Sequence, residues 1–302
     1  MASTKFGSAR TPAVSLGLPV FNGGRMLVQA IESILAQTWG DFELIISDNA
    51  STDDTAERVR DYAERDRRIR FFRQTHNIGS GNNWSFVARQ ARGEWFKWFS
   101  ANDDYAPTLV QDCLEPLRSD SGVVLCYGRT QFIDLEGKRL DVYAGDFDAL
   151  SSDPVERYRI VRERLHLGTP VQAGVIRLDA LRRCGYLGNY RDSDRVLTAG
   201  LALAGKFLLL PQVLFYRRWH PSVASALRGP LEVQRLYHPN AMRAPFLMNL
   251  PRQIGQIEVA MRTPLGLRAK ARAIGAVVRY TDWRRKLLSQ FARGSTHHAA
   301  GR

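Results

Sequence analysis

Apolar and polar residues alternate in blocks along the first third of the chain, and the blocks predict strands and helices in turn. Short apolar runs predict four buried strands, at residues 13–19, 42–47, 69–72 and 95–99. The segments between them place apolar residues on one helical face, as Leu27, Ile31 and Ile34 illustrate. Repeated strand–helix alternation predicts right-handed βαβ units, and therefore an α/β fold with a mostly parallel sheet flanked by helices.

The pattern weakens after Pro107 and stops near residue 225. Further strands and helices are predicted at residues 107–117 (helix), 123–127 (strand), 171–177 (strand), 180–184 (helix), 196–204 (helix) and 207–217 (a closing strand broken by Pro211). Residues 128–165 are charged and weakly patterned, and they give no assignment. We therefore expect a flexible N-terminus at 1–12, an α/β domain at 13–225, and a basic helical extension at 226–302 that ends in a disordered tail.

Polar side chains follow two of the predicted strands at the point where each strand ends. Asp48 comes directly after the second strand, and Asn102, Asp103 and Asp104 follow the fourth. Because the carboxyl ends of parallel strands form the ligand-binding edge of an open α/β sheet, we expect these side chains to share one edge. Oxygen ligands of this kind suit Mg²⁺ or Mn²⁺ held together with a phosphorylated ligand.

A local interpretation competes with the functional one at both strand ends. An isolated Asn-Asp-Asp is most often a polar turn that caps a helix, and Ser51 and Asp54 have the spacing of a capping box. The capping box does not require Asp48, which lies outside it. A carboxylate at that position can accept hydrogen bonds from a nucleobase N–H or a ribose hydroxyl.

The charge of the chain is concentrated at its C-terminal end. The net charge is +13, and residues 226–302 contain 14 Lys/Arg against 3 Asp/Glu. Such asymmetry predicts an anionic partner, either lipid headgroups or nucleic acid. Nucleic acid is disfavoured because the extension has no recognised reading motif. Residues 265–291 form basic amphipathic stretches suited to peripheral contact with an anionic membrane, and a helix packed against the body is the alternative.

Cysteine usage and hydropathy bear on the compartment. Cys113, Cys126 and Cys184 are widely spaced and lack a C-x-x-C motif, which predicts buried thiols and no disulfide or zinc site. The polar N-terminus has no apolar secretion signal. Lys206 and Pro211 interrupt the most apolar window, at 196–215, which argues against a membrane span. We expect a cytoplasmic protein, in a peripheral position at the inner face of the membrane if the basic extension binds lipid.

Three motifs, in the same order and spacing, resemble family 2 glycosyltransferases. They read Val-Ser-Leu-Gly-Leu-Pro-Val-Phe-Asn, Glu-Leu-Ile-Ile-Ser-Asp-Asn-Ala-Ser-Thr-Asp and Ala-Arg-Gly-Glu-Trp-Phe-Lys-Trp-Phe-Ser-Ala-Asn-Asp. The resemblance covers residues 13–107 closely and extends more loosely to about residue 225. It implies a Rossmann-like GT-A-type fold, a nucleotide-sugar donor, a divalent metal ion and inversion at the anomeric carbon.

The resemblance also assigns roles to residues of the first two motifs and of the acidic segment. Pro19 and Asn22 match the nucleotide-facing first loop, Asp48 matches the acid that binds the base of the donor, and Asp103 matches the last Asp of the acidic metal motif.

The acidic motif departs from the family pattern, because its preceding acidic positions are Ser100 and Asn102 here. Asn102 can hydrogen-bond a ribose but adds no charge to a metal site. Asp104 is a candidate to supply that charge.

Two later segments complete the predicted site. Residues 190–197 resemble the acidic motif at the start of a late helix, with Asp194 in the place of the catalytic base and Asp192 as the fallback. A helix N-cap is the competing interpretation, chiefly for Asp192.

Residues 216–222 resemble a segment that closes over the donor phosphates. There Arg217, Arg218 and His220 are expected at the diphosphate, and His220 also at the metal. As a bare pattern, a single His beside a Pro is more often structural.

The sequence thus predicts a metal-dependent, hexosyltransferase-like enzyme. It would move a sugar with inversion from a nucleotide-diphosphate sugar, with UDP-sugars as candidates, to a saccharide or lipid-linked acceptor in envelope or extracellular polysaccharide synthesis. The alternative is a catalytically inactive nucleotide-sugar-binding or scaffold protein on the same fold, suggested by Ser100 and Asn102. A sugar nucleotidyltransferase is disfavoured because its glycine-rich N-terminal signature is absent.

Overall fold

The computed structural model describes residues 11–165, 173–218, 230–242 and 250–279. The strands are β1 (Val14–Val20), β2 (Phe42–Asp48), β3 (Ile69–Arg73), β4 (Trp95–Trp98), β5 (Asp104–Tyr105), β6 (Val123–Ile133), β7 (Arg139–Val142), β8 (Val175–Arg177) and β9 (Lys206–Arg218). The helices are α1 (Gly24–Leu35), α2 (Thr55–Arg65), α3 (Ser80–Arg89), α4 (Leu109–Ser119), α5 (Pro154–Arg164), α7 (Leu178–Cys184), α8 (Ser193–Ala204), α9 (Pro230–Tyr237), α10 (Leu250–Arg262) and α11 (Leu267–Arg279).

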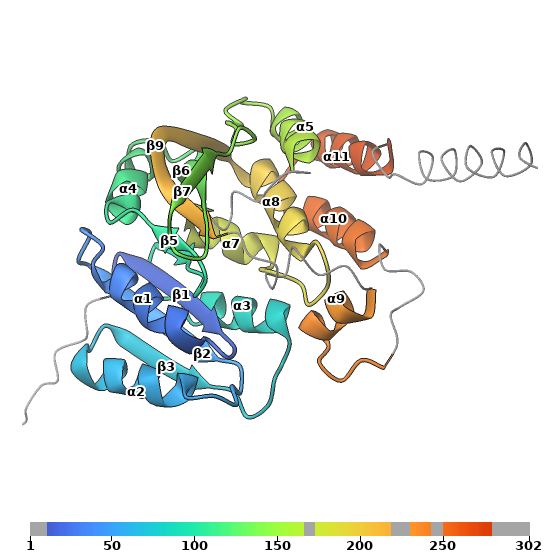
Figure 1. Cartoon of the computed structure of the whole chain (residues 1–302). Coiled ribbons are helices and arrows are strands. Elements are labelled where there is room, and N and C mark those ends of the chain that lie inside the picture. The colour runs from blue at the N-terminus through green and yellow to red at the C-terminus, as the bar shows by residue number, and fades with distance from the viewer. Residues whose placement is uncertain (1–10, 166–172, 219–229, 243–249, 280–302) are drawn as a thin grey trace, which may run out of the picture.

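One mixed sheet organises the described residues. Its strand order is β3-β2-β1-β4-β8-β6-β9-β5, with β7 added beside β6. The first four strands in this order pair in parallel, which confirms the βαβ units predicted from the sequence. The second half is mixed, because β8 lies antiparallel between β4 and β6, and β5 pairs antiparallel with β9. The α/β fold class is therefore confirmed, and the parallel arrangement is concentrated in the N-terminal half (Figure 1).

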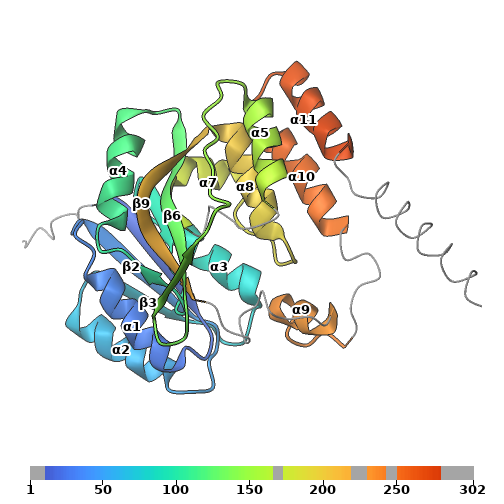
Figure 2. The same cartoon turned by 45° about the horizontal axis from the view of Figure 1, so that its top comes forward.

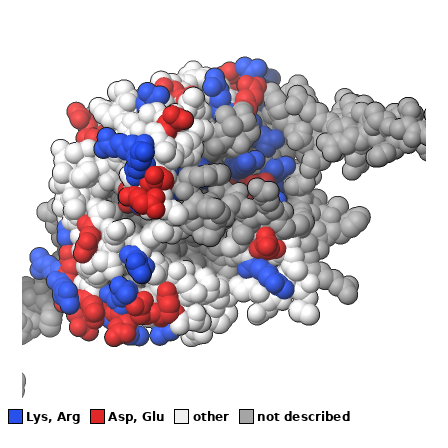
Figure 3. All heavy atoms as spheres, in the orientation of Figure 1, with Lys and Arg blue, Asp and Glu red and all other residues white. Residues whose placement is uncertain are grey.

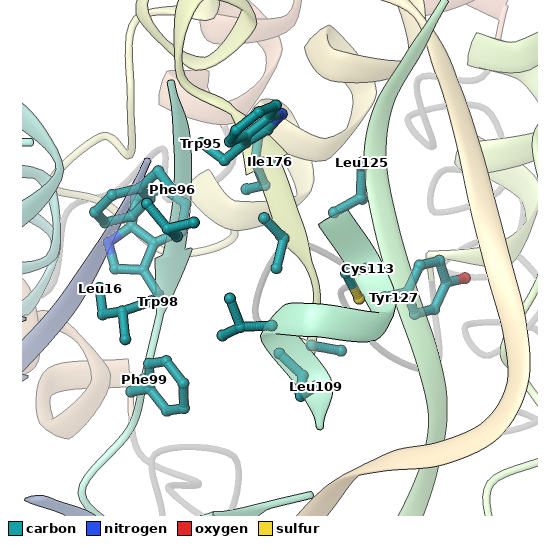
Figure 4. Packing of buried hydrophobic residues seen from close by; sticks show 14 of the residues in the cluster. Leu16, Trp95, Phe96, Trp98, Phe99, Leu109, Cys113, Leu125, Tyr127 and Ile176 are labelled. Atoms are coloured by element: carbon teal, nitrogen blue, oxygen red, sulfur yellow. The ribbon is translucent and has the colours of Figure 1, made fainter. Parts of the chain in front are cut away.

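The core lies under β4 and the neighbouring strands. Trp95, Phe96 and Trp98 are buried on β4, and Phe99 follows them at 0% exposure. Figure 4 shows them in the same cluster as Cys113 and Tyr127, which α4 and β6 contribute. Both faces of β4 are covered, which explains why the strand is apolar throughout instead of alternating.

Proline 211 distorts β9 without ending it. The register with β6 steps from Gly128 beside Leu210 to Arg129 beside Val213, so Pro211 and Gln212 form a bulge. The strand predicted as broken at Pro211 is thus continuous from Lys206 to Arg218. This continuity carries Arg217 and Arg218 to the edge of the sheet where the acidic segment ends.

The described part of the C-terminal extension packs on the α/β body. α10 lies against α8, and α11 lies against α5 and α10 (Figures 1 and 2). A second hydrophobic cluster joins these helices and contains Tyr158, Ala199, Leu203, Ala260, Ala273, Ala276 and Val277. The apolar face of α11 is therefore turned towards the body, as the packed-helix alternative predicted. The boundary proposed at residue 225 stays a prediction, as do the flexible N-terminus and the disordered tail, which lie outside the described residues.

Two sequence expectations concern features away from the sheet. All three cysteines are buried and free, in agreement with the prediction of buried thiols. Within the ranges that the structure describes, no helix is long and apolar enough to cross a bilayer.

Candidate functional site

The loops that follow β1 and β2 are joined into one unit by hydrogen bonds. Asn22, at a φ of 49°, donates its backbone N–H to Ser51 Oγ (2.8 Å) and accepts from the Thr52 backbone N–H at Oδ1 (2.9 Å). The backbone N–H of Gly23 donates to Thr55 Oγ1 (2.9 Å). Asn22 is thus committed to fixing the shape of this loop pair, where the left-handed conformation carries a strain that these bonds offset.

Asp48 ends β2 as a fully buried carboxylate. Its Oδ1 accepts the backbone N–H of Ser51 (2.9 Å), whereas its Oδ2 makes no hydrogen bond to any residue that the structure describes. Arg73 Nε lies 3.4 Å from Oδ2, with 48% of the Arg73 side chain exposed. Pro19 is buried one strand away, where it pairs in register with Ser47. A buried acceptor oxygen with spare capacity, at the carboxyl edge of the sheet, suits a ligand N–H.

The start of α3 is tied to the end of β2 by Asn83. The Asn83 side chain is buried; its Oδ1 accepts from Ser47 Oγ (2.6 Å), and its Nδ2 donates to the Ser47 carbonyl (3.0 Å). The neighbouring Asn82 N–H donates to Oδ1 of Asn189 (3.3 Å), and Ser85 Oγ donates to the Leu187 carbonyl (2.7 Å). Helix α3 therefore connects the strand end that carries Asp48 with the loop that precedes α8.

Arg218 holds the acidic segment in place. Its backbone N–H donates to Asp103 Oδ1 (2.9 Å), and its Nη2 pairs with Asp104 Oδ2 (2.7 Å). The same guanidinium donates through Nε to the Asn102 carbonyl and through Nη1 to the carbonyls of Asp134 and Leu135, each at 2.9 Å. Arg218 is 7% exposed. Its role in this arrangement is to clamp the acidic segment to the turn between β6 and β7, and its contact with a diphosphate stays a prediction.

A buried lysine lies behind the acidic segment. Lys97 is fully buried on β4; its Nζ donates to the Trp98 carbonyl (2.6 Å) and lies 5.0 Å and 4.7 Å from the ring centres of Phe99 and Tyr105. Burial lowers the pKa of Lys97 to about 7.

The surroundings of Asp103 have opposing effects on the pKa of its carboxyl group. Burial raises the pKa of Asp103 above its ordinary value, and the bond from Arg218 N–H and the charges of Arg217 and Lys97 oppose that rise. Arg217, partly exposed near the end of β9, therefore supplies positive charge beside the acidic segment.

The chemistry of the donor set around Asp103 fits a cation that is shared with a phosphorylated ligand. Among the described residues, no group of three or more His, Cys, Asp or Glu side chains could hold a metal by itself. Mg²⁺ is commonly bound through one or two carboxylates together with substrate phosphates, so one carboxylate at a strand end satisfies that pattern. Asp104 is engaged by Arg218, and His220 lies outside the described residues.

The two candidate bases stand at the start of α8 in different surroundings. Asp192 precedes the helix at a φ of 64° and pairs with Arg252 Nη1 (3.1 Å) and Arg195 Nε (3.7 Å). Asp194 is partly exposed in the first turn. Burial first, and then the carboxylates of Asp194 and Asp192, raise the pKa of Tyr237 on α9 to about 12, which locates both acids near that ring.

The three predicted acids, Asp48, Asp103 and Asp194, lie on elements that contact one another. Asp48 and Asp103 follow β2 and β4, the two parallel neighbours of β1, so they belong to the same edge of the sheet. Asp194 lies in the first turn of α8, and the loop before α8 is hydrogen-bonded to α3, which in turn contacts the end of β2. Asn189 of that loop also donates to the Tyr237 carbonyl (2.7 Å).

Sequence reasoning missed several residues of this region. Arg73 is the last residue of β3, in register with Asp48, so its place at the carboxyl edge could have been found from the strand pattern. Lys97 was detectable as a lone charge in an aromatic strand. Arg252 gave no signal, because its partner Asp192 is brought near only by the packing of α10 on α8.

Known proteins share sequence patterns with the N-terminal part of this chain. The sequence model described as "Glycosyl transferase family 2" matches residues 15–177. Chondroitin synthase of Escherichia coli is 34% identical over 128 residues, which cover 42% of this chain and 18% of the synthase. An uncharacterized glycosyltransferase of Rickettsia typhi is 30% identical over 131 residues, covering 43% of this chain and 40% of that protein. The chain thus spans less than half of either curated relative.

Solved structures share the fold. Residues 1–349 of TarS from S. aureus, in complex with UDP-GlcNAc, superpose with a TM-score of 0.64 at 15% identity, covering 88% of this chain and 71% of that one. The mannosyltransferase PcManGT from Pyrobaculum calidifontis, in complex with GDP-Man and Mn²⁺, gives 0.52 at 17% identity, covering 95% and 81%. Together with the family match over more than half of the residues, the shared fold leads to one conclusion: this chain belongs to glycosyltransferase family 2.

Proposed function

We propose that this chain transfers a sugar from a nucleoside-diphosphate sugar to a saccharide or lipid-linked acceptor, with inversion at the anomeric carbon. The observation that carries the proposal is the buried Asp48 carboxylate, whose Oδ2 makes no hydrogen bond to a described residue, at the edge that also bears Asp103. Membership of family 2 supports the reaction class. The similarity to chondroitin synthase, over 18% of that protein, supports a role in envelope or extracellular polysaccharide synthesis.

Asp48 and Arg73 are proposed to read the base of the donor. The carboxylate accepts a ring N–H, and the exposed part of Arg73 donates to a base carbonyl oxygen. Uracil and guanine offer both groups, whereas adenine has no ring N–H in its base-pairing edge. The neighbours with UDP-GlcNAc and GDP-Man are compatible with either base, and we place UDP-sugars first.

The diphosphate is proposed to lie at the end of β4. Mg²⁺ or Mn²⁺ held there by Asp103 would neutralise charge on the leaving diphosphate. Arg217 adds fixed positive charge beside it, with Arg218 and His220 as the remaining candidates. Asn102, exposed beyond Ser100, is proposed to hydrogen-bond the ribose, and Pro19 and Asn22 shape the first loop.

Asp194 is the proposed general base. An inverting displacement requires a group that removes the proton of the acceptor hydroxyl on the face opposite the leaving group. Asp192, whose carboxylate is paired with Arg252 and Arg195, remains the fallback. The position of Asp194 in the first turn of α8, together with the hydrogen bond from Asn189 of the preceding loop to the Tyr237 carbonyl, supports an acceptor site bounded by α8 and α9.

One observation favours the inactive alternative. Ser100 and Asn102 are neutral, Asp104 is paired with Arg218, and a buried lysine lies behind Asp103. These features weaken the attraction for a divalent cation relative to a site with several unpaired acids. A nucleotide-sugar-binding scaffold would tolerate that weakness, whereas a metal-dependent transferase would need the diphosphate to complete the site.

A donor screen tests the proposal. The full chain is incubated with pooled UDP- and GDP-sugars and Mn²⁺ or Mg²⁺, and release of nucleoside diphosphate is measured. We expect release with one donor, and loss of at least about 100-fold in kcat for Asp194→Asn, the usual scale for a general base. Asp61→Asn, an exposed acid on α2, is the matched control. Calorimetric binding of a nucleoside diphosphate without metal, combined with no turnover, would establish the scaffold.

A further inference from the structure

The outer face of α10 carries a stripe of exposed apolar side chains that the proposed reaction does not use. Ile254, Ile257 and Met261 are 47%, 38% and 53% exposed. Their spacing of three and four residues places them on one face of the helix. Leu267, shortly beyond them in the chain, is 87% exposed. We call Ile254, Ile257 and Met261 the α10 stripe; contiguous apolar surface of this kind marks contact sites.

The opposite face of α10 fixes the direction of the stripe. Val259 and Ala260 are buried, and Val259 occupies the space beside Gly200 on α8, where a Cβ would clash with it. A Cβ on Gly255 would in the same way clash with the Tyr190 hydroxyl. Because α10 packs this closely against α8 and the preceding loop, its orientation is fixed. The α10 stripe therefore faces away from the body.

The residues around the stripe are basic. Between residues 250 and 279 the chain has six Lys/Arg and one acid, Glu258. The side chains of Arg262 and Arg272 are 57% and 59% exposed, and they pair with Glu258 (3.7 Å) and Asp153 (2.7 Å). Arg268 at the start of α11 is also exposed, so the formal charge of this region remains positive. On the face drawn in Figure 3, both signs mix over α1 and α2. An apolar stripe with a basic rim is complementary to an anionic bilayer surface.

Other occupants fit these charges less well. A second copy of the chain on the same face would bring one basic rim against another, which costs Coulomb energy. Nucleic acid would satisfy the basic side chains but would leave the apolar stripe exposed to water. An anionic lipid surface uses both the apolar and the basic parts.

We propose that the α10 stripe docks on an anionic membrane, with Ile254, Ile257 and Met261 at the boundary between headgroups and acyl chains. The sequence had directed attention to the basic stretches from residue 265 onward, but the apolar face of α11 packs on the body. The consequence for acceptor choice rests on the proposed function. Because Arg252 at the start of α10 pairs with Asp192 (3.1 Å), docking would hold the Asp192–Asp194 loop on the inner side of α10, one helix diameter (roughly 10 Å) from the bilayer surface at which a lipid-linked acceptor would lie.

Vesicle flotation with the full chain tests the docking. Vesicles of neutral phosphatidylcholine are compared with vesicles containing about one-third phosphatidylglycerol, at low and high salt. We expect binding to the anionic vesicles only, and a loss of about tenfold or more for the triple variant Ile254→Ser, Ile257→Ser, Met261→Ser. The matched control is Leu140→Ser, Val142→Ser, Leu150→Ser, which removes comparably exposed apolar side chains far from α10 and should bind as the unmodified chain does.

Charge variants and oligomeric state separate the alternatives. Arg262→Glu with Arg268→Glu should weaken vesicle binding several-fold at low salt and much less at high salt. Unchanged vesicle binding by the stripe variant would overturn the proposal, as would an unmodified dimer that the stripe variant converts to a monomer. Binding of duplex DNA as tight as vesicle binding, and unaffected by the stripe variant, would also overturn it.

These readouts do not depend on sugar transfer. The stripe variant should release nucleoside diphosphate with a soluble acceptor as the unmodified chain does. A failure of the proposed reaction therefore leaves vesicle binding interpretable.

Discussion

The two carboxylates at the parallel edge of the sheet, Asp48 and Asp103, have contrasting surroundings. Asp48 is fully buried, is held by one backbone N–H, and retains an oxygen without a hydrogen bond among the described residues. Asp103 is held by the backbone of Arg218, whose guanidinium clamps the adjoining segment, and a buried lysine lies behind it. Under the proposed function, the contrast implies that the part of the site assigned to the base would be preformed, whereas the part assigned to the phosphates would need its ligand to attract a cation.

Removal of the Asp103 carboxylate should give the largest effect. Asp103→Asn keeps the shape but removes the charge that would hold a metal, so we expect kcat for donor cleavage to fall by about 100- to 1000-fold. Binding of the nucleoside without phosphates, measured by calorimetry, should hardly change. Asp141→Asn, an exposed acid on β7, controls for the loss of one charge. Full activity in Asp103→Asn would mean that the phosphate side does not depend on this carboxylate.

A substitution of Arg218 tests how much its hydrogen bonds to the acidic segment contribute to the stability of the surroundings of Asp103. Arg218→Met removes bonds to one carboxylate and three carbonyl oxygens in a nearly buried position. Because buried partners lose their hydrogen bonds, we expect a loss of about 3 kcal/mol in the free energy of unfolding. Chemical denaturation measures it, with Arg60→Met, an exposed arginine on α2, as the control. A loss no larger than that of the control would show that the clamp contributes little.

A substitution of Asp48 tests the carboxylate that is proposed to bind the base of the donor. Asp48→Asn replaces a charged acceptor by an amide, and hydrogen bonds to charged groups contribute about 1.5–3 kcal/mol. We therefore expect UDP or GDP to bind about 10- to 100-fold more weakly by calorimetry, and the preference over ADP to shrink. Equal losses for all three nucleotides would point to a structural role, since Asp48 also holds the Ser51 N–H.

The smallest effect concerns the pH dependence of stability. The pKa of Lys97 is about 7 in the folded chain against an ordinary value of 10.5, so between these values the unfolded state binds more protons. Stability should therefore rise with pH across this window, by at most about 1.4 kcal/mol per pH unit from this group. Denaturation midpoints at a series of pH values should show a smaller rise in Lys97→Met, whereas Lys138→Met, an exposed control, should keep it. Identical pH profiles for Lys97→Met and the unmodified chain would contradict this assignment.

The N-terminal half was readable from sequence because its signals are local. Each parallel strand is an apolar run covered on both faces, and each helix shows a clear apolar face, so the βαβ order and the acids at the strand ends follow from neighbouring residues. The family resemblance carried by these motifs was confirmed. The roles assigned to individual acids stay predictions.

Residues 128–165 resisted interpretation for a physical reason. β7 reads Arg-Leu-Asp-Val, so its alternation extends over only four residues, and all four are exposed. On α5 the buried side includes Arg157, which is 6% exposed and donates to the carbonyls of Ala202 (2.8 Å) and Ser151 (2.7 Å). A helix that buries an arginine against backbone oxygens does not present the apolar periodicity on which sequence interpretation depends.

The sequence by itself determined the family, the parallel half of the sheet and the residue types at the strand ends, because periodicity and motifs are properties of adjacent residues. Tertiary structure decided which charges meet: Arg218 with the acidic segment, Arg252 with Asp192, and Arg73 with Asp48. It also decided that the apolar face of α11 packs inward while the α10 stripe remains exposed. The physical reason is that pairing and burial depend on contacts between residues far apart in the chain, and no local pattern records those contacts.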